Sequence, residues 1–363
     1  MSALTFRQTD TARRSSEEAR AEILSAPGFG QYFTDFMARA RWTAEGGWQD
    51  DEITAYGPYQ IDPAAAVLHY AQEVFEGLKG FRHSDGSVWT FRPEKNAERM
   101  QRSCRRLALP ELDTESFLNA LRGVARADEP WVPEPTGEQS LYLRPYMFAS
   151  ENFLGVRSAH QVDFGVIASP AGSYFPRGVQ PLVVWASDTY ARAGAGGTGA
   201  AKCGGNYASS LLGKQEAADH GADEVLFLDS ETHTRIDELS GMNVFAVTSD
   251  GRLLTPELTG SILEGVTRDS VLRLAADSGL TPAEQPLVFS EVLDRIASGQ
   301  ITEMFACGTA AVITPIGEFR TADGTWTVAD GGSGERTMAL REELTGIQYG
   351  RVPDRHGWLT RLV

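Results

Sequence analysis

The chain has 363 residues, more than one hydrophobic core usually organises, so we expect two domains. With 42% hydrophobic and 23% charged residues, the composition is typical of a soluble globular protein. A formal net charge of -16 argues against a nucleic-acid partner and against charge-driven binding to an anionic membrane, because phosphates would be repelled.

The first 25 residues are polar and predict a loosely held N-terminal arm. They lack the continuous apolar core of a secretory signal, and no later stretch approaches the length of a membrane span. We therefore expect a cytoplasmic protein without membrane partners. Cys104, Cys203 and Cys307 are far apart and form no C-x-x-C motif, so the sequence predicts reduced thiols, no disulfide framework and no metal site.

Residues 26–175 are expected to form a small α/β domain. The runs "VWTFR", "SLYLRPYMF" and "VDFGVIAS" are typical of strands, and "EKNAERMQRSCRRLAL" is typical of a helix. Helical spacing there places four residues on one buried face: Ala97, Met100, Cys104 and Leu107. The pattern predicts an α+β unit.

Glycine and proline are dense in residues 169–181, which predicts a linker. We expect an interdomain loop region at 176–190 and a second, larger α/β domain at 191–363. Its strands are predicted in "LVVWAS", "EVLFLD", "NVFAVTS" and "RLLTP". Helices are expected at about 206–219, 264–278 and 337–346.

One lysine lies in the glycine-rich stretch "GGTGAAKCGGNY". The chain has only four lysines, and arginine supplies nearly all of its 33 basic residues, so positive charge does not require lysine here. An amine, unlike a guanidinium, can lose its proton near neutral pH and attack a carbonyl to form a Schiff base. A lysine in such a loop is more often simply solvated, so Lys202 alone leaves both interpretations open.

Three later segments favour the Schiff-base interpretation of Lys202 over the solvated one. Glu238 precedes a small-residue turn, Val266 and Thr267 begin a predicted helix whose free amides favour an anion, and Thr309 lies in a Gly-Thr-Ala turn. Each has an ordinary interpretation as a solvated turn or an unliganded helix start. Together with Lys202 they supply an amine for an aldehyde, a carboxylate and anion donors, which are the needs of pyridoxal 5'-phosphate.

Seven ordered segments resemble the branched-chain amino acid aminotransferases, which are fold type IV pyridoxal-phosphate enzymes. They are "HYAQEVFEGLKGF", "FRPEKNAERM", "SLYLRP", "AKCGGNY", "DELSGMN", "GSILEGVTRDS" and "ACGTAAVITP", and the resemblance covers roughly residues 27–360. It is greatest for actinobacterial members. It implies a homodimer in which the larger domain has a sheet curled toward a barrel and the cofactor lies between the domains.

The resemblance assigns roles around the cofactor. Lys202 becomes the Schiff-base lysine and proton shuttle, Glu238 the partner of the pyridine nitrogen, and Tyr207 the partner of the ring hydroxyl. The phosphate ligands would be Arg99, Thr309 and the backbone amides of Val266 and Thr267, while Gly241 and Met242 complete the cofactor-binding set.

The resemblance also implies a substrate pocket with an apolar side and carboxylate-binding groups. Its members would be Phe29, Tyr70, Phe75, Tyr142, Arg144, Val156, Tyr174, Ser240, Gly308 and Ala310. Arg144 would bind the second carboxylate of glutamate or 2-oxoglutarate. Tyr70 and the loop near Val156 would reach across the dimer.

Two departures from the family pattern are visible. The turn after Glu238 reads Leu239-Ser240-Gly241, where many relatives have a second glycine or a threonine. The resemblance therefore does not fix the size and polarity of the pocket at Ser240. Ala311 and Thr314 replace a pair of redox-sensing thiols found in the mammalian relatives, so that switch should be missing.

The sequence therefore predicts an enzyme that moves the amino group reversibly between leucine, isoleucine or valine and 2-oxoglutarate. Its partners are amino acids, 2-oxo acids and a second copy of the chain. One alternative is a specialised transaminase of the same fold acting on an aromatic or modified amino acid. Another is a non-catalytic small-molecule binding protein.

Overall fold

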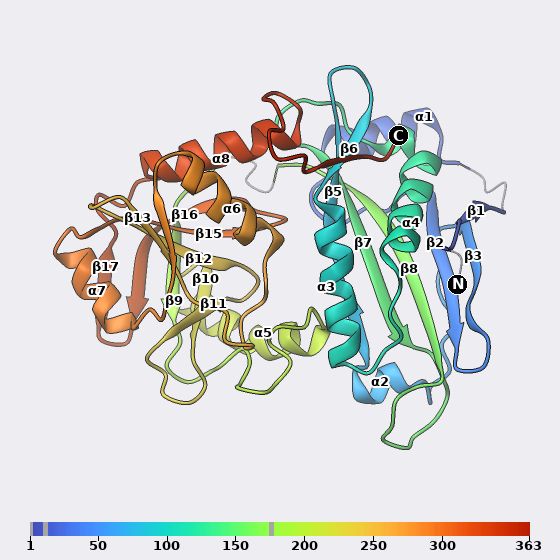
Figure 1. The fold of residues 1–363 in the computed structure, drawn as a ribbon, viewed down its shortest axis with the longest axis horizontal. Helices are drawn as coiled ribbons and strands as arrows, with labels where there is room; N and C mark the ends of the chain where they lie inside the picture. The colour runs from blue at the N-terminus through green and yellow to red at the C-terminus, as the bar shows by residue number, and fades with distance from the viewer. Residues whose placement is uncertain (1–2, 10–13, 174–177) are drawn as a thin grey trace. The chain divides into compact units, whose positions relative to one another are not determined.

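The computed structural model describes residues 3–9, 14–173 and 178–363. The chain divides into two compact units (Figure 1). The first comprises Met1–Pro176, Ala201–Gly204 and Ile347–Val363, and the second comprises Arg177–Ala200 and Gly205–Gly346.

The first unit is built on a nine-stranded sheet of order β1-β3-β2-β8-β7-β5-β6-β18, with β4 paired to β7. The strands are β1 (Arg7–Gln8), β2 (Phe36–Thr43), β3 (Gly47–Ala55), β4 (Glu73–Phe75), β5 (Leu78–Arg82), β6 (Val88–Phe91), β7 (Ser140–Ala149), β8 (Gln161–Ala171) and β18 (Leu359–Arg361). The helices are α1 (Glu17–Ser25), α2 (Ala66–Tyr70), α3 (Pro93–Arg106) and α4 (Thr114–Ala127), followed by the short 3-10 helix Glu129–Trp131. The three strands and the helix predicted from the sequence are confirmed.

Helix α4 shows why this unit has one core. Asp113 caps its first turn by accepting a hydrogen bond from the Ser116 amide at 2.9 Å. Phe117, Leu121 and Val124 recur at helical spacing and are buried. The helix packs on α3 and on strands β2 and β8 (Figure 1), so its apolar stripe and the sheet bury one another.

The described residues of the N-terminal segment are held by the first unit, unlike the loosely held arm expected from their polarity. Phe6 is only 3% exposed, and its amide donates to Asp51 Oδ2 at 3.0 Å. The Leu4 amide donates to Ser116 Oγ at 2.8 Å. Helix α1 has no buried residue, as its polar sequence suggests. Hydrogen bonds, burial of Phe6 and the parallel pairing of β1 with β3 therefore attach the segment.

The second unit has its own nine-stranded sheet, of order β11-β10-β9-β16-β15-β12-β13-β14, with β17 paired to β16. Its strands are β9 (Leu182–Ala186), β10 (Glu224–Leu228), β11 (Ile236–Leu239), β12 (Asn243–Thr248), β13 (Arg252–Thr255), β14 (Thr281–Glu284), β15 (Ile301–Gly308), β16 (Val312–Thr321) and β17 (Gly324–Thr327). The helices are α5 (Gly204–Asp219), α6 (Val266–Asp277), α7 (Phe289–Ala297) and α8 (Glu335–Gln348). The four strands and three helices predicted for this region are confirmed.

The observed boundaries differ from the expected ones in three places. Strand β8 continues to Ala171, so the start of the 169–181 segment is strand, and β9 lies inside the expected loop region 176–190. Residues 347–363 belong to the first unit because β18 pairs antiparallel with β6. No helix among the described residues is long and apolar enough to cross a bilayer.

Candidate active site

Lys202 belongs to the first unit, although the sequence placed it in the 191–363 domain. Its amide donates to Ser103 Oγ on α3 at 2.9 Å, and its carbonyl accepts from the Phe75 amide of β4 at 3.0 Å. These long-range hydrogen bonds draw the segment Ala201–Gly204 away from its neighbours in sequence. No local pattern in the glycine-rich stretch predicts them.

The surroundings of the Lys202 amine favour its neutral form. The side chain is half-buried, and Nζ lies 4.7 Å from the centroid of the Phe75 ring. Burial lowers the pKa of Lys202 from 10.5 to about 8; the charge of Arg99 also lowers it, whereas Glu76 acts in the opposite direction. The amine can therefore lose its proton near neutral pH, which a nucleophile or general base must do.

Glu76 is a site residue that the sequence analysis missed. Its carboxylate accepts from Arg99 Nε and Nη2, both at 2.8 Å, and from Asn96 Nδ2 at 2.8 Å. The side chains of Glu76 and Arg99 are 0% and 5% exposed. Burial would raise the pKa of Glu76, but Arg99 more than offsets this and holds the pKa below its ordinary value. A carboxylate within the largely apolar run "VFEGL" was the available signal.

The structure brings together four of the predicted substrate-binding residues in the first unit. Arg144 Nη2 donates to the Tyr142 hydroxyl at 3.0 Å, and the Arg144 guanidinium carbon lies 4.8 Å from the Phe75 ring centroid. The Phe29 and Tyr142 rings meet edge to face at 5.0 Å. Arg144 Nε is buried without a hydrogen-bond partner in the described part of the chain. The cluster combines apolar rings with an incompletely satisfied cation.

Two further predicted residues lie at the surface of this unit. Tyr70 is 38% exposed, and its hydroxyl donates to the Leu154 carbonyl. Val156 is 88% exposed, in the loop between β7 and β8. Tyr174 lies outside the described residues. The exposure of Tyr70 and Val156 distinguishes them from the buried groups around Lys202.

Glu238 is buried near the end of β11 in the second unit. Arg192 Nη1 lies 2.8 Å from its Oε1, and the two side chains are 3% and 2% exposed respectively. The Leu263 amide donates to the same oxygen at 2.9 Å, while Asn243 Nδ2 donates to Oε2 at 3.1 Å. The carboxylate thus has a fixed orientation and a neighbouring positive charge. Sequence reasoning found Glu238 but missed Arg192 and Asn243, which lie 46 residues before it and five after it.

The turns near Glu238 also converge within the second unit. A Cβ built on Gly241 would lie 3.8 Å from Tyr207 Cε1, so the tyrosine ring of α5 lies beside this turn. A Cβ on Gly308 would lie 3.4 Å from both the Gly241 carbonyl oxygen and Met242 Cγ. Ser240 is buried, and Thr309 and Ala310, both half-buried, follow Gly308 in the adjoining turn. Residues far apart in sequence are therefore neighbours.

Helix α6 begins next to the same carboxylate. Its N-cap residue is Gly265, which has no side chain to accept a hydrogen bond from the first turn. The amides of Val266 and Thr267 therefore have no side-chain cap from this residue. A Cβ on Gly265 would overlap Asn243 Oδ1 at 2.1 Å, and Asn243 also donates to Glu238. Only glycine permits this approach. The helix N-terminus is a suitable place for a phosphate.

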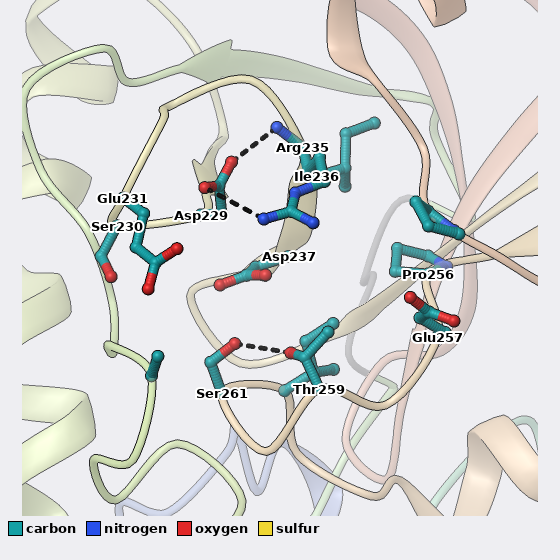
Figure 2. A pocket seen from close by; sticks show the side chains of 13 residues that line it. Asp229, Ser230, Glu231, Arg235, Ile236, Asp237, Pro256, Glu257, Thr259 and Ser261 are labelled. Carbon is teal, nitrogen blue, oxygen red and sulfur yellow. Dashed lines mark hydrogen bonds and ion pairs between the residues drawn. The ribbon is translucent and has the colours of Figure 1, made fainter.

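A separate cavity of about 90 Å³ lies elsewhere in the second unit, as Figure 2 shows. Asp229, Arg235 and Asp237 line it, and burial raises the pKa of Asp237. None of the predicted site residues lines this cavity. No group of three or more metal-ligating side chains is found among the described residues. The residues with the predicted chemistry therefore lie outside this pocket.

Comparison with known proteins identifies the family. Residues 73–319 match the family model described as Amino-transferase class IV. The chain belongs to this family. The matched range includes Glu76, Lys202 and Glu238.

Named relatives extend this match over nearly the whole chain. The branched-chain-amino-acid aminotransferase of Mycolicibacterium smegmatis is 51% identical over 362 residues, covering 99% of this chain and 98% of the relative. The protein of the same name from Mycobacterium tuberculosis is 51% identical over 351 residues, with coverages of 96% and 95%. The resemblance to actinobacterial members is confirmed.

Solved structures confirm the fold type. The branched-chain amino acid aminotransferase of T.th., solved with pyridoxamine 5'-phosphate, is 29% identical with a TM-score of 0.75, covering 90% of this chain and 99% of that one. The same enzyme has been solved with N-(5'-phosphopyridoxyl)-L-glutamate (29%, TM-score 0.74) and with 4-methylvaleric acid (28%, TM-score 0.74), with the same coverages. The expected mixed α/β fold of type IV, with a curled sheet, is therefore correct.

Proposed function

We propose that this protein is a branched-chain-amino-acid aminotransferase that uses pyridoxal 5'-phosphate. It moves the amino group reversibly between leucine, isoleucine or valine and 2-oxoglutarate. The observation that carries the proposal is the half-buried Lys202 amine, with its pKa lowered to about 8, in a chain 51% identical to named branched-chain aminotransferases. The amine provides the chemistry, and the relatives indicate the substrate class.

The residues present fit this cofactor. The cofactor's aldehyde would react with an amine, which Lys202 provides, and its ring nitrogen would pair with a carboxylate, which Glu238 provides. Its phosphate would be bound by cations, hydroxyls or free amides. Arg99, Thr309 and the first turn of α6 are the groups proposed for the phosphate. Tyr207, beside the turn after Glu238, is proposed to hydrogen-bond the ring hydroxyl. Support comes from the T.th. relative, which was solved with pyridoxamine 5'-phosphate.

In the proposed mechanism, Lys202 works as nucleophile and then as base. Bound pyridoxal phosphate supplies an aldehyde and a ring that withdraws electrons from the substrate's alpha carbon. The neutral Lys202 amine would take the proton from the alpha carbon of the amino donor and, in the second half-reaction, would deliver a proton to the corresponding carbon of the oxo acid acceptor, which a permanently charged ammonium cannot do. Glu238, held by Arg192, Asn243 and an amide, retains the negative charge that keeps a proton on the ring nitrogen.

The aromatic cluster supports a branched aliphatic substrate. Phe29, Phe75 and Tyr142 present apolar rings, and each methylene buried against them contributes up to about 0.8 kcal/mol. Arg144, whose Nε has no hydrogen-bond partner among the described residues, supplies a cation for the second carboxylate of glutamate. The T.th. complexes with 4-methylvaleric acid and with phosphopyridoxyl-glutamate support a pocket that accepts both types of side chain.

We also propose that the enzyme is a cytoplasmic homodimer in which Tyr70 and the loop near Val156 contribute to the partner's pocket. The exposure of both residues in one copy, and of Leu154 to which Tyr70 bonds, supports this arrangement. Tyr174, Ser240, Gly308 and Ala310 remain proposed members of the substrate pocket.

A panel of 2-oxo acids with glutamate as amino donor tests the proposed function. The oxo acids of leucine, isoleucine and valine should give the highest kcat/KM, because pyruvate lacks apolar surface and larger aromatic acids exceed the pocket. If phenylpyruvate or a more elaborate oxo acid exceeds 4-methyl-2-oxopentanoate by about tenfold, which is about 1.4 kcal/mol, the enzyme is instead a specialised transaminase. Cofactor binding without transfer to any acid would indicate a binding protein.

A further inference from the structure

Glu73 contacts the backbone two residues after Lys202. It is the first residue of β4, which pairs with β7 from Glu73 opposite Phe148 to Phe75 opposite Tyr146. Its carboxylate accepts a hydrogen bond from the amide of Gly204, the first residue of α5. A Cβ on Gly204 would lie 2.5 Å from Glu73 Oε1, so the approach depends on glycine. A strand residue thus contacts a helix start 131 positions later in the chain.

This contact and two others hold the backbone around Lys202. The Phe75 amide donates to the Lys202 carbonyl at 3.0 Å, and the Lys202 amide donates to Ser103 Oγ at 2.9 Å. Glu73 supplies the third, two residues beyond the lysine. With the peptide groups on both sides held, the direction in which the Lys202 side chain leaves the backbone is set by β4 and α3.

We infer that Glu73 is a positioning residue for Lys202, acting through the Gly204 amide at the start of α5. The inference rests on the proposed function, in which Lys202 is the reacting amine. The carboxylate of Glu73 accepts a hydrogen bond from the Gly204 backbone amide, and the proposed mechanism gives Glu73 no reacting atom. Its part is to keep the lysine's backbone in the orientation that the reaction requires.

The chemistry of Glu73 suits this part. A carboxylate at a helix N-terminus is stabilised by the helix dipole, and a hydrogen bond from an amide to a charged acceptor is stronger than one to a neutral acceptor. Burial raises the pKa of this half-buried group above its ordinary value, although the Gly204 amide and the charge of Arg144 act in the opposite direction. A half-buried carboxylate with a backbone partner is costly to leave unpaired, so the contact should persist.

Two variants separate the hydrogen bond from the charge. Glu73→Leu removes the acceptor, while Glu73→Gln keeps a neutral acceptor of the same length. Since a displacement of about 1 Å in a reacting group can cost up to about a hundredfold, Glu73→Leu should lower kcat with leucine by about tenfold to a hundredfold. Glu73→Gln should restore most of kcat. KM for leucine should change by less than about twofold in both, because the aromatic cluster is untouched.

A readout independent of catalysis is amide hydrogen exchange in the cofactor-loaded enzyme. Glu73→Leu should accelerate exchange in peptides covering residues 203–207, and Glu73→Gln should do so much less. Asp113→Ala is the matched control, since Asp113 is also a carboxylate that accepts a helix-start amide in this unit, at the start of α4. It should accelerate exchange only near α4 and leave kcat unchanged.

The outcomes distinguish the positioning role from the proposed function. An active wild type with an equally active Glu73→Leu variant overturns the positioning role alone. A variant whose only defect is a higher KM for glutamate also overturns it, because Glu73 would then act through Arg144. A wild-type enzyme that loads cofactor but transfers no amino group overturns the proposed function. Loss of kcat, faster exchange at 203–207 and rescue by glutamine together support the inference.

Discussion

Each unit contains a buried glutamate–arginine pair, and we propose opposite uses for these two pairs. Glu76 and Arg99 in the first unit meet at 2.8 Å, and so do Glu238 and Arg192 in the second, with every side chain at most 5% exposed. In the first pair, Arg99 is a proposed ligand of the cofactor phosphate and Glu76 orients it. In the second pair, Glu238 is the proposed partner of the ring nitrogen and Arg192 orients it.

Both orienting partners are well bonded within the protein. Glu76 receives two hydrogen bonds from Arg99 and one from Asn96. Arg192 Nη1 also donates to the Gly199 and Ser261 carbonyls at 3.3 and 3.2 Å. Glu238 is bonded as fully as Glu76, so the comparison teaches that the hydrogen bonds of a buried ion pair fix the geometry of both members and do not reveal which member is functional. Both pairs also face the large desolvation cost of buried charge, which only good geometry offsets.

The largest expected effect is loss of the amine itself. Lys202→Ala should abolish transamination, because neither pair can replace a nucleophile, while cofactor should still bind through its phosphate. Borohydride reduction of the loaded wild type followed by peptide mapping locates the modified lysine. A pyridoxyl group on Lys79, Lys95 or Lys214 would contradict the assignment.

Removing one member of either buried pair should lower the free energy of unfolding of the unit that contains it. Glu76→Leu leaves Arg99 buried and uncompensated, and Arg192→Leu does the same to Glu238, so each should lower the free energy of unfolding by about 3–5 kcal/mol. Denaturant unfolding followed by circular dichroism measures the loss. Glu98→Gln is the control, because its pair with Lys95 is 43% and 50% exposed and should contribute at most about 1 kcal/mol. Equal losses at exposed and buried sites would refute the comparison.

Changing the functional acid without breaking its packing should affect the rate more than the stability. Glu238→Gln keeps hydrogen-bond capacity but cannot hold a proton on the ring nitrogen. We expect kcat to fall at least about a hundredfold, which is about 2.7 kcal/mol of barrier. Stopped-flow absorbance of each half-reaction measures it. Near-wild-type turnover would show that Glu238 has no electronic role.

The predicted substrate cation should have a smaller and selective effect. Arg144→Ala should lower kcat/KM for glutamate about tenfold relative to leucine, because only glutamate has a second carboxylate and a charge-assisted hydrogen bond contributes about 1.5–3 kcal/mol. Steady-state kinetics with each amino donor measures the ratio. An equal loss with both donors would place Arg144 outside side-chain recognition.

The smallest expected effect is a difference in reactivity between lysines. Because burial lowers the pKa of Lys202 to about 8, its neutral fraction rises as the pH increases through 8, well below the ordinary range for lysine. In the cofactor-free enzyme, trace acetylation of Lys202 should reach half its maximal rate near pH 8 and be severalfold faster there than that of exposed Lys95. Mass spectrometry of the labelled peptides measures both rates. A midpoint above about pH 10, the ordinary value for lysine, would contradict the assigned environment.

The sequence predicted the long periodic elements correctly because their signal is local. The strand run containing Arg144 and the helix containing Arg99 each have a repeating apolar pattern that indicates which face is buried. The N-terminal segment was predicted less well, since the attachment of Phe6 depends on partners far along the chain. Likewise, β18 was missed because a three-residue edge strand has almost no pattern of its own.

The site shows the same division. Lys202, Glu238 and the first turn of α6 were proposed from the sequence because their residue types and short motifs indicate their chemistry, and their roles stay predictions. Glu76, Arg192 and Asn243 were missed because each acts by contacting a residue that the sequence does not mark as its neighbour. Glu76 and Asn243 even lie inside quoted motifs, but a motif does not say which distant side chain its buried polar residue will contact.

By itself, the sequence determined the order of the main elements and the chemical groups available, because these follow from periodicity and residue type, and its resemblance to known proteins indicated the family. Tertiary structure alone decided that residues 201–204 belong with β4 and α3, and that Arg99 and Glu238 each have a buried partner. It also determined the environment that lowers the Lys202 pKa. The physical reason is that burial and charge proximity depend on distances in space, and residues such as Glu73 and Gly204 become neighbours only when the chain folds.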